Sequence, residues 1–501
     1  MGPKSIWVGT ALEGQSYPTY QGNSAVDVVI IGGGITGITA AMQLSKEGKR
    51  VIVLEAMKIG QGTTGYSTGN LYATIDENLS YIKSKWNSDV MKSVVESRKE
   101  AMHLIENNIV EFEIDCDYVN VPMHFYAEES TPHTEDFFSS EYDALELCGL
   151  MPQYIQQGLP FETRKMMVIP AQAQYHPLKY VQKLAAALPE NCKVYENSKV
   201  ISADGDTGIV ETEMGTITAD AIVMATHTPI GIYPVQTVLG PYREFAVAGE
   251  LLDDSLSDGI FWDVGHPKHS IRIYREDGKR YIMIVSDKFK TGQHGDSSKY
   301  ISEIENYLKQ RFNVGELKYL WGAQQYSPAD GLPYIGQYWG KIHIMTGFST
   351  SGLVYGTLAA MIVADKIIGR ENKYSDLYDA NRHTPLKSLK DFVKENVNNA
   401  IQVIKDFPSQ GDIESLGEIE LGTGRVIDHN GHKLAVYRHQ DGQAEIVSAI
   451  CTHMGCVVRF NEAETSWDCP CHGSRFKTNG EVIEGPAIEA LPSNPLRLRI
   501  V

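Results

Sequence analysis

Two short motifs near the C-terminus constrain this chain more than any other feature. Cys451-x-His453 is followed, after fifteen residues, by Cys469-x-x-His472, so each motif offers one thiolate and one imidazole. One type of [2Fe–2S] cluster binds two thiolates on one iron and two imidazoles on the other. The alternatives are a zinc site and a disulfide scaffold, but zinc motifs usually pair like ligands. The mixed motifs therefore favour an iron–sulfur cluster, with Cys451 and Cys469 on one iron and His453 and His472 on the other.

The stretch 413–501, which carries these motifs, resembles the Rieske family. The resemblance implies a small all-β domain in which Cys456 and Cys471 form a disulfide that ties the two ligand loops together. It also implies that residues 485–487, with the sequence Gly-Pro-Ala, cover the cluster from a third side. A disulfide is uncommon in a cytosolic protein, so this pairing depends on the resemblance alone.

Two residues after the second motif bear on the reduction potential of such a cluster. Ser474 matches a hydroxyl that donates to a bridging sulfide in the Rieske family, whereas Phe476 stands where the family has a tyrosine. The resemblance thus implies that one hydrogen bond to sulfur is missing. Because fewer hydrogen bonds to sulfur lower the potential, we expect a value above that of plant-type ferredoxins and below that of respiratory Rieske proteins.

A second redox signature lies near the N-terminus. Residues 26–31 predict a buried strand that enters the motif Gly32-x-Gly34-x-x-Gly37, followed by an apolar helix and a second strand that ends at Glu55. Such glycines let the backbone approach a pyrophosphate, which binds at the N-terminus of the helix. An acid in the position of Glu55 binds ribose hydroxyls. The pattern predicts a dinucleotide site rather than a glycine-rich turn without a ligand, and by itself it does not distinguish FAD from NAD.

Three further segments favour FAD. They are an apolar strand that ends in small residues (218–227), a glycine-rich turn that opens a long apolar helix (342–369), and the loop 62–68 that follows Glu55. The N-terminus of such a helix would stabilise a reduced, anionic flavin. The whole pattern over residues 24–370 resembles the D-amino-acid oxidase and sarcosine oxidase superfamily of FAD-dependent oxidoreductases. By this resemblance, the residues that contact FAD besides the three glycines and Glu55 are Thr63, Thr64, Thr68, Ala225, Thr226, Gly347, Ser351 and Gly352.

The two resemblances together imply a chain of the α/β plus α+β class. We expect a two-dinucleotide-type, Rossmann-like FAD-binding domain, an antiparallel sheet that caps it on the substrate side, and a small all-β Rieske domain. Some relatives attach the flavin through a histidine or cysteine of the site, but this chain has neither there, so we predict non-covalent FAD. The expected boundaries are 24–87, 175–238 and 326–372 for the FAD-binding domain, 88–174 and 239–325 for the cap, 373–412 for a helical linker, and 413–501 for the Rieske domain.

The inserted segments and their borders carry the candidate catalytic residues. Residues 270–285 contain two alternating runs joined by a Glu-Asp-Gly-Lys turn, which predicts a β-hairpin. Arg272 on this hairpin is the first candidate for binding a substrate carboxylate, because its planar fork pairs two oxygens; a solvated strand arginine is the alternative. His269 is a candidate base, and Tyr326 is a candidate for lining the site. Weaker candidates are His266, His294 and Tyr334.

Composition narrows the class of partner. The chain has 501 residues, a net charge of −18 and no basic cluster, which argues against nucleic acid as a partner. No export signal or transmembrane segment is recognisable, so we expect a soluble, cytoplasmic protein. Residues 385–405 have apolar side chains at helical spacing, and we expect this linker helix to pack on one or both domains.

The expected function follows from the pairing of two cofactors. A flavin accepts two electrons as a hydride from a C–N or C–O bond, whereas a Rieske cluster accepts one electron at a time. The resemblance implies a dehydrogenase that oxidises an amine, an N-methyl compound or an amino acid and passes electrons from FAD through the cluster to an external protein or quinone. We expect His453 and His472 to lie on the exposed side of the cluster and to form the exit. The alternatives are an NAD(P)H-driven reductase for a partner enzyme and a redox sensor without turnover.

Overall fold

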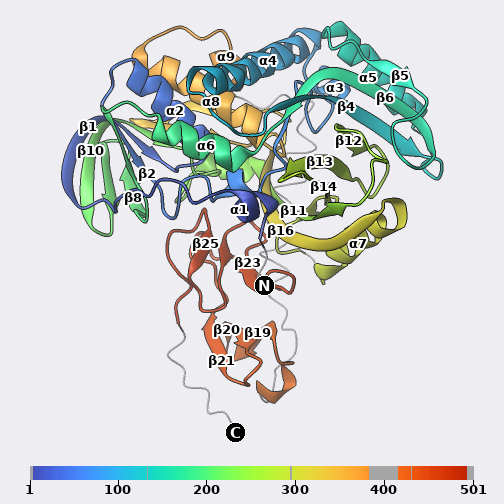
Figure 1. Cartoon of the computed structure of the whole chain (residues 1–501). Helices are drawn as coiled ribbons and strands as arrows, with labels where there is room; N and C mark the ends of the chain where they lie inside the picture. The colour runs from blue at the N-terminus through green and yellow to red at the C-terminus, as the bar shows by residue number, and fades with distance from the viewer. Residues whose placement is uncertain (1–3, 133, 294–295, 383–415, 430, 494–501) are drawn as a thin grey trace.

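The computed structural model describes residues 4–132, 134–293, 296–382, 416–429 and 431–493. A large part contains two sheets and all the long helices, and a small β part formed by the C-terminal residues lies beneath it (Figure 1). This arrangement confirms the expected fold class. The predicted linker helix at 385–405 and the candidate base His294 lie outside the described residues.

The first sheet of the large part is mostly parallel and has the strand order β17-β18-β10-β1-β2-β7. Its central strands are apolar runs because both faces of the sheet are covered; the last four residues of β1 and all of β2 are buried. β17 pairs antiparallel with β18 at one edge, and β8 and β9 form a hairpin that extends the sheet from β10. The strands are β1 (Gly22–Ile31), β2 (Val51–Leu54), β7 (Cys192–Tyr195), β8 (Val200–Asp204), β9 (Ile209–Thr212), β10 (Gly215–Met224), β17 (Tyr334–Trp339) and β18 (Ile342–Thr346).

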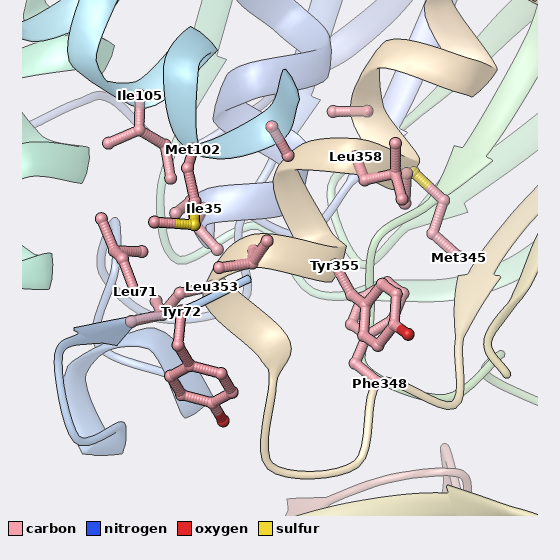
Figure 2. Close-up of a cluster of buried hydrophobic side chains, with 14 of the residues drawn as sticks. Ile35, Leu71, Tyr72, Met102, Ile105, Met345, Phe348, Leu353, Tyr355 and Leu358 are labelled. Atoms are coloured by element: carbon pink, nitrogen blue, oxygen red, sulfur yellow. The ribbon is translucent and has the colours of Figure 1, made fainter. Parts of the chain in front are cut away.

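Helices α2 and α8 pack closely against each other beside this sheet. A Cβ atom on Gly356 of α8 would lie only 2.3 Å from Thr36 Oγ1 of α2, so the glycine permits the close approach. Figure 2 shows Leu353 of α8 near Ile35 of α2 and Met102 of α4 in one apolar cluster. α4, which lies in the expected cap segment 88–174, therefore packs against α8. The helices and turns here are α2 (Ile35–Lys46), η1 (Thr63–Tyr66), α3 (Leu79–Lys85), α4 (Ser88–Glu111), α6 (Pro177–Ala186), η2 (Pro234–Val238), α8 (Gly352–Ile368) and α9 (Ser375–Tyr378).

The second sheet is largely antiparallel and has the order β15-β11-β14-β13-β12-β4-β6-β3, with β16 on β11 and β5 on β6. The predicted hairpin is confirmed, because β13 and β14 pair antiparallel. Its turn residues Asp277 and Gly278 have φ angles of 50° and 73°, which suit the tight turn between twisted strands. The elements are β3 (Asn70–Leu71), β4 (Val119–Glu128), α5 (Glu135–Leu147), β5 (Gln153–Ile155), β6 (Thr163–Gln174), β11 (Leu239–Leu251), β12 (Ile260–Asp263), β13 (Ser270–Glu276), β14 (Lys279–Val285), β15 (Phe289–Lys290), α7 (Ser298–Arg311) and β16 (Val314–Pro328).

A short N-terminal helix, α1 (Ile6–Thr10), packs against the loop 62–68. Trp7 is fully buried, and its indole nitrogen donates to the Ser67 carbonyl oxygen at 2.6 Å. The Ser5 hydroxyl donates to the Gly65 carbonyl oxygen at 2.6 Å. The sequence analysis assigned no function to the residues before 24. These two hydrogen bonds show that the N-terminal segment holds the predicted FAD loop.

The small C-terminal part is built from two antiparallel sheets, as expected for an all-β domain. The first has the order β19-β20-β21 and the second the order β22-β23-β24-β25. Its elements are η4 (Leu416–Glu418), β19 (Thr423–His429), β20 (His432–Arg438), β21 (Ala444–Ser448), β22 (Arg459–Asn461), β23 (Ser466–Asp468), β24 (Arg475–Phe476) and β25 (Val482–Glu484). Across the described part of the whole chain, no helix is both long and apolar enough to cross a bilayer.

Candidate functional site

The four predicted cluster ligands lie together in two loops of the small part. Cys451, His453, Cys469 and His472 are all buried. The two imidazole rings lie 5.0 Å apart, centre to centre, at an interplanar angle of 83°. Both Nδ1 atoms are buried and have no hydrogen-bond partner in the described structure. Because a buried polar atom without a partner is costly, two adjacent unpartnered imidazole nitrogens fit a metal centre that both residues ligate.

The thiol side of the centre also fits a cluster. Cys451 and Cys469 are free cysteines, and a hydrogen bond from Cys469 lowers the pKa of the Cys451 thiol to about 7. The sulfur atoms of Cys456, Cys469 and Cys471 lie within 4.8 Å of one another. Cys456 and Cys471 are bonded to each other, however, and a disulfide sulfur is not the thiolate that binds iron. The thiolates left for an iron are therefore Cys451 and Cys469.

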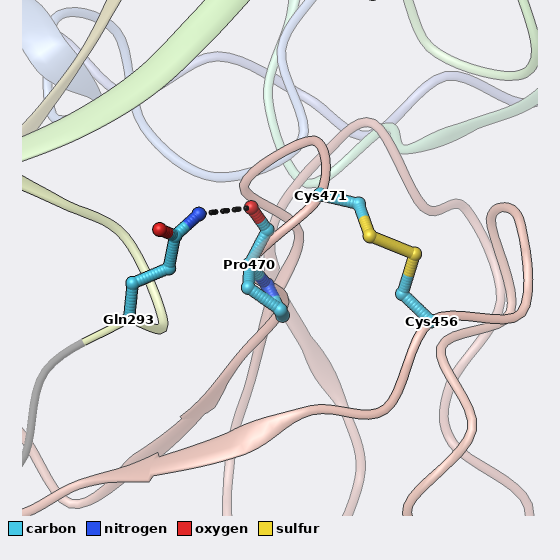
Figure 3. The surroundings of a disulfide bond; sticks show 4 residues. All are labelled: Gln293, Cys456, Pro470 and Cys471. Atoms are coloured by element: carbon cyan, nitrogen blue, oxygen red, sulfur yellow. Dashed lines mark hydrogen bonds between the residues drawn. A yellow bond between two sulfur atoms is a disulfide. The ribbon is translucent and has the colours of Figure 1, made fainter. Parts of the chain in front are cut away.

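The disulfide Cys456–Cys471 joins the two ligand loops (Figure 3). The same view shows Gln293, from the segment after β15 in the large part, donating to the Pro470 carbonyl oxygen at 3.3 Å. Nearby, a Cβ on Gly292 would lie 2.7 Å from the Asp468 carbonyl oxygen. The second ligand loop therefore packs directly against the large part of the molecule.

Ser474 connects the second ligand loop to the loop 485–487. Its hydroxyl oxygen accepts a hydrogen bond from the Ala487 backbone N–H at 3.0 Å, and the side chain is fully buried. Phe476 is also fully buried and packs in the apolar core of the small part. The lowered reduction potential that Phe476 implies stays a prediction.

The glycine motif after β1 forms a cradle suited to a dinucleotide. Gly32 has a φ angle of 111°, and a Cβ there would lie 2.4 Å from the Ala225 carbonyl oxygen. A Cβ on Gly37 would lie 1.9 Å from the Gly32 carbonyl oxygen. Gly34 is the N-cap of α2 and offers no side chain to the first backbone N–H groups. The residues therefore leave room for a phosphate at the helix N-terminus.

Glu55 and Thr64 hold this cradle in shape. Glu55 directly follows β2, and its carboxylate accepts hydrogen bonds from the backbone N–H groups of Gly33 and Met57 at 2.7 and 2.8 Å. Burial raises the pKa of Glu55 above its ordinary value. The Thr64 hydroxyl accepts the Ile35 N–H at 3.0 Å.

The second half of the predicted FAD site lies at the start of α8. Gly347 has a φ angle of 79°, which favours glycine at the turn before the helix. Ser351 is the N-cap residue of α8, and its hydroxyl donates to Tyr72 Oη at 3.1 Å rather than capping the helix. A Cβ on Gly352 would meet nothing within 4 Å. This open space in front of the first turn of α8 fits the flavin ring that the sequence places there.

The three predicted catalytic residues lie in three different places. Arg272 is buried, donates to the Thr68 carbonyl oxygen at 2.6 Å and lies over the Trp7 ring. Its guanidinium is therefore engaged by residues of the predicted FAD loop and of α1. His269 stacks on Tyr307 at 4.1 Å near α7. Tyr326 is fully buried at the boundary with the small part, and its hydroxyl lies 3.3 Å from the His472 carbonyl oxygen.

The sequence analysis missed the residues that join the two parts. His227, with a φ angle of 67°, lies between Thr63 Oγ1 at 3.3 Å and Glu484 Oε1 at 3.2 Å, and its ring is 4.8 Å from that of Tyr326. Gln324 donates to the Gly473 carbonyl oxygen at 2.9 Å. A histidine directly after Thr226 was the available sequence signal, but its partner Glu484 lies 257 residues away.

A buried ionic network extends the same interface. Arg243 on β11 lies 2.6 Å from Glu464 and 3.8 Å from Glu484. Arg475 lies 3.0 Å from Asp468 and 3.1 Å from Glu464. Although burial acts to raise the pKa of Asp468, Arg475 and Arg243 outweigh it and hold that pKa below its ordinary value. These charges are paired, as buried charges must be, and they tie the small part to the cap sheet.

The interface corrects one expectation. His453 and His472 were expected on the exposed side of the cluster, but each is only 7% exposed. His453 Nε2 lies 3.1 Å from the Gly231 carbonyl oxygen of the large part. The histidine side therefore faces the FAD-binding part and cannot be an open exit in this structure.

Comparisons with known proteins find a family match for the large part and another for the small part. The family described as FAD dependent oxidoreductase (DAO) matches residues 27–366, and the Rieske [2Fe-2S] domain matches residues 412–495. The chain is 27% identical to the putative Rieske 2Fe-2S iron-sulfur protein YhfW of Bacillus subtilis (strain 168), over 98% of this chain and 97% of that protein. It is 21% identical to the gamma-glutamylputrescine oxidoreductase of Escherichia coli (strain K12), over 74% and 90%.

Among solved structures, the glycine oxidase of Geobacillus kaustophilus superposes with a TM-score of 0.58 at 19% identity, covering 72% of this chain and 99% of that one. This likeness concerns the fold of the large part. The family match, in contrast, spans most of the chain and includes the glycine cradle, Glu55 and the start of α8. The chain thus belongs to the DAO family of FAD-dependent oxidoreductases and carries a C-terminal Rieske [2Fe–2S] domain.

Proposed function

We propose that this protein is a dehydrogenase that oxidises an amine, an N-methyl compound or an amino acid and delivers the electrons through its Rieske domain to an external protein or quinone. The observation that carries the proposal is the contact between the two cofactor-binding parts. Thr63 Oγ1 of the predicted FAD loop and Glu484 Oε1 both lie within hydrogen-bonding distance of His227 Nδ1, and Glu484 directly precedes the loop 485–487. FAD supplies two-electron oxidation and the cluster one-electron transfer, so a fixed contact between their sites suits electron transfer.

Two acidic side chains, one on β11 and one in contact with the turn before α8, support an amine substrate. Glu244 on β11 accepts a hydrogen bond from Gln325 Nε2 at 2.9 Å, and burial raises its pKa to about 8. Glu77 accepts a hydrogen bond from the Ser349 hydroxyl at 3.0 Å. A Glu244 carboxyl group held neutral near pH 7 would hydrogen-bond an amine group of the substrate, and it would pair with a cationic amine after releasing its proton. Lys288, whose charge acts on Glu244 and whose Nζ lies 3.5 Å from Asp76, would pair with the carboxylate of an amino acid.

The names of two similar proteins agree with this substrate class. One is a gamma-glutamylputrescine oxidoreductase and the other a glycine oxidase, so an amine and an amino acid are both represented. None of the contacts described above identifies the external electron acceptor. Its nature as a one-electron carrier, the cytoplasmic location and the non-covalent attachment of FAD stay predictions.

The test is an anaerobic optical titration of the purified protein with N-methyl amines, amino acids and NAD(P)H. We expect one amine or amino acid to bleach the flavin absorbance, followed by reduction of the cluster. Bleaching by NAD(P)H alone would contradict the proposal and make the protein a reductase. Acid precipitation of the same protein should release the yellow cofactor into the supernatant; colour that stays with the precipitate would show covalent attachment.

A further inference from the structure

The ring of His453 makes its polar contacts with residues from the other half of the molecule. Its Nε2 atom lies 3.1 Å from the Gly231 carbonyl oxygen and 3.0 Å from Gln236 Oε1. Both neighbours belong to the segment around η2 in the FAD-binding part. Because a carbonyl oxygen can only accept, Nε2 must carry the hydrogen. In a neutral imidazole, Nδ1 then has the free lone pair.

The Gln236 side chain is held in a single orientation. Its Nε2 donates to the carbonyl oxygens of Pro229 and Gly231 at 2.7 and 2.9 Å, and its Oε1 accepts the Tyr233 N–H at 3.0 Å. A flipped amide would place its NH₂ group against the Tyr233 N–H and its oxygen against two carbonyl oxygens. The flip is therefore excluded by the hydrogen-bond network, and the amide oxygen must point toward His453.

The opposite side of the same ring is left free for a metal. His453 Nδ1 is buried and has no partner among the described residues. We propose that Gln236 is a positioning residue for the Rieske cluster: from the FAD-binding domain, it accepts the Nε2 hydrogen of His453 and so directs Nδ1 toward the iron. The neighbouring backbone strengthens the contact, because the Gly231 N–H donates to the Pro486 carbonyl oxygen at 3.1 Å.

This contact should affect the electronic properties of the cluster. An acceptor on the outer nitrogen of a metal-bound imidazole raises the basicity of the ligand. A more basic ligand stabilises the oxidised iron, so the contact lowers the reduction potential. The same contact holds the histidine side of the cluster against the FAD-binding domain. The flavin domain is thus expected to tune the centre to which it is joined.

The test replaces Gln236 by methionine, which has a similar length and no acceptor oxygen. We expect Gln236→Met to raise the potential by about 59 mV, which is a tenfold change in a one-electron equilibrium. The g values of the reduced cluster in its electron paramagnetic resonance spectrum should also shift. Both quantities are measured on the full-length protein with FAD and cluster bound, and neither requires a substrate.

Gln324 offers a matched control. It is also a buried interface glutamine, but it donates to the Gly473 carbonyl oxygen and to the Tyr326 hydroxyl rather than to a ligand ring. We expect Gln324→Met to leave the potential within about 15 mV of the original, a factor of less than two by the same constant. The proposal is overturned if Gln236→Met leaves the potential and g values unchanged, or if both variants shift them equally.

A measurement on the unaltered protein decides the question if Gln236→Met loses its cluster. In D₂O, pulsed electron–nuclear double resonance follows the hydrogens on the outer nitrogens of the cluster histidines. At least one of them should exchange slowly, because Gly231 and Gln236 enclose it. Exchange of all of them within the mixing time would overturn the proposal. The inference rests on the presence of the cluster and not on the proposed substrate, so either can fail without the other.

Discussion

The six cysteine and histidine side chains of the predicted cluster site lie between residues 451 and 472, whereas the predicted FAD site draws on residues from 32 to 352 and is contacted by helix α1. Two loops and one disulfide bring the cluster ligands together locally. The predicted FAD site instead involves two sheets, α8 and the N-terminal helix α1. This helix is distant in sequence from the loop 62–68 that it contacts. The comparison indicates that a change at a single ligand should remove the cluster. FAD binding should also be weakened by changes at distant residues that support the site.

The largest expected effect is the loss of a cluster ligand. Cys451→Ser removes one of the two free thiolates, and we expect complete loss of the cluster spectrum with the flavin absorbance retained. Reduction of flavin by substrate should continue, while transfer to an external one-electron acceptor stops. Cys148→Ser is the control, since that thiol is free and far from the motifs in sequence. A normal cluster spectrum in Cys451→Ser would exclude Cys451 as a ligand.

The second prediction concerns a distant support of the FAD site. Trp7 is fully buried, donates to the Ser67 carbonyl oxygen and lies under Arg272. Trp7→Ala should cost about 3–5 kcal/mol of stability, as for other buried tryptophans, and should weaken FAD binding. Thermal release of FAD, followed by fluorescence, measures the effect. Trp339→Ala is the control, because that side chain is 63% exposed. Equal effects of the two changes would contradict the supporting function of α1.

A smaller effect is expected for the disulfide. A closed loop of about 15 residues contributes about 3 kcal/mol by restricting the unfolded chain, and Cys456 and Cys471 are separated by 15 positions. The double change Cys456→Ser and Cys471→Ser should lower the temperature at which the cluster bleaches. Flavin release should stay at its original temperature, because the disulfide lies within the small domain. A parallel fall in both temperatures would instead show that the two domains unfold as one unit.

How far the sequence predicts these sites depends on the distance between the residues involved. The ligand motifs and the glycine motif are local, so the residues around them were enough to predict both sites. Arg272 was correctly placed on a hairpin, but no local pattern shows that the Thr68 backbone and Trp7 already occupy its guanidinium. The expected exit at His453 was wrong for the same reason. Its contact with Gln236 spans 217 positions, and nothing near either residue indicates it.

The last prediction concerns the pH dependence of stability and tests whether Glu244, in the large part, acts separately from the cluster. Burial raises the pKa of Glu244 to about 8, and the charge of Asp76 acts in the same direction. The folded protein therefore keeps a proton that the unfolded chain loses near pH 4.3. Stability should fall as the pH rises from about 4.3 to 8, by up to about 1.4 kcal/mol per pH unit.

Glu244→Gln should remove this slope from the temperature of flavin release. The amide can still accept the hydrogen bond from Gln325, but it does not titrate in this range. Glu250→Gln is the control on the same strand, because Glu250 pairs with Lys279 at the surface. The temperature of cluster bleaching should keep its pH dependence in both variants, since Glu244 and Glu250 both lie on β11 of the large part. If the flavin-release temperature of Glu244→Gln changes with pH as that of the original protein does, the Glu244 carboxyl group is not held protonated. This group must then be charged before substrate binds.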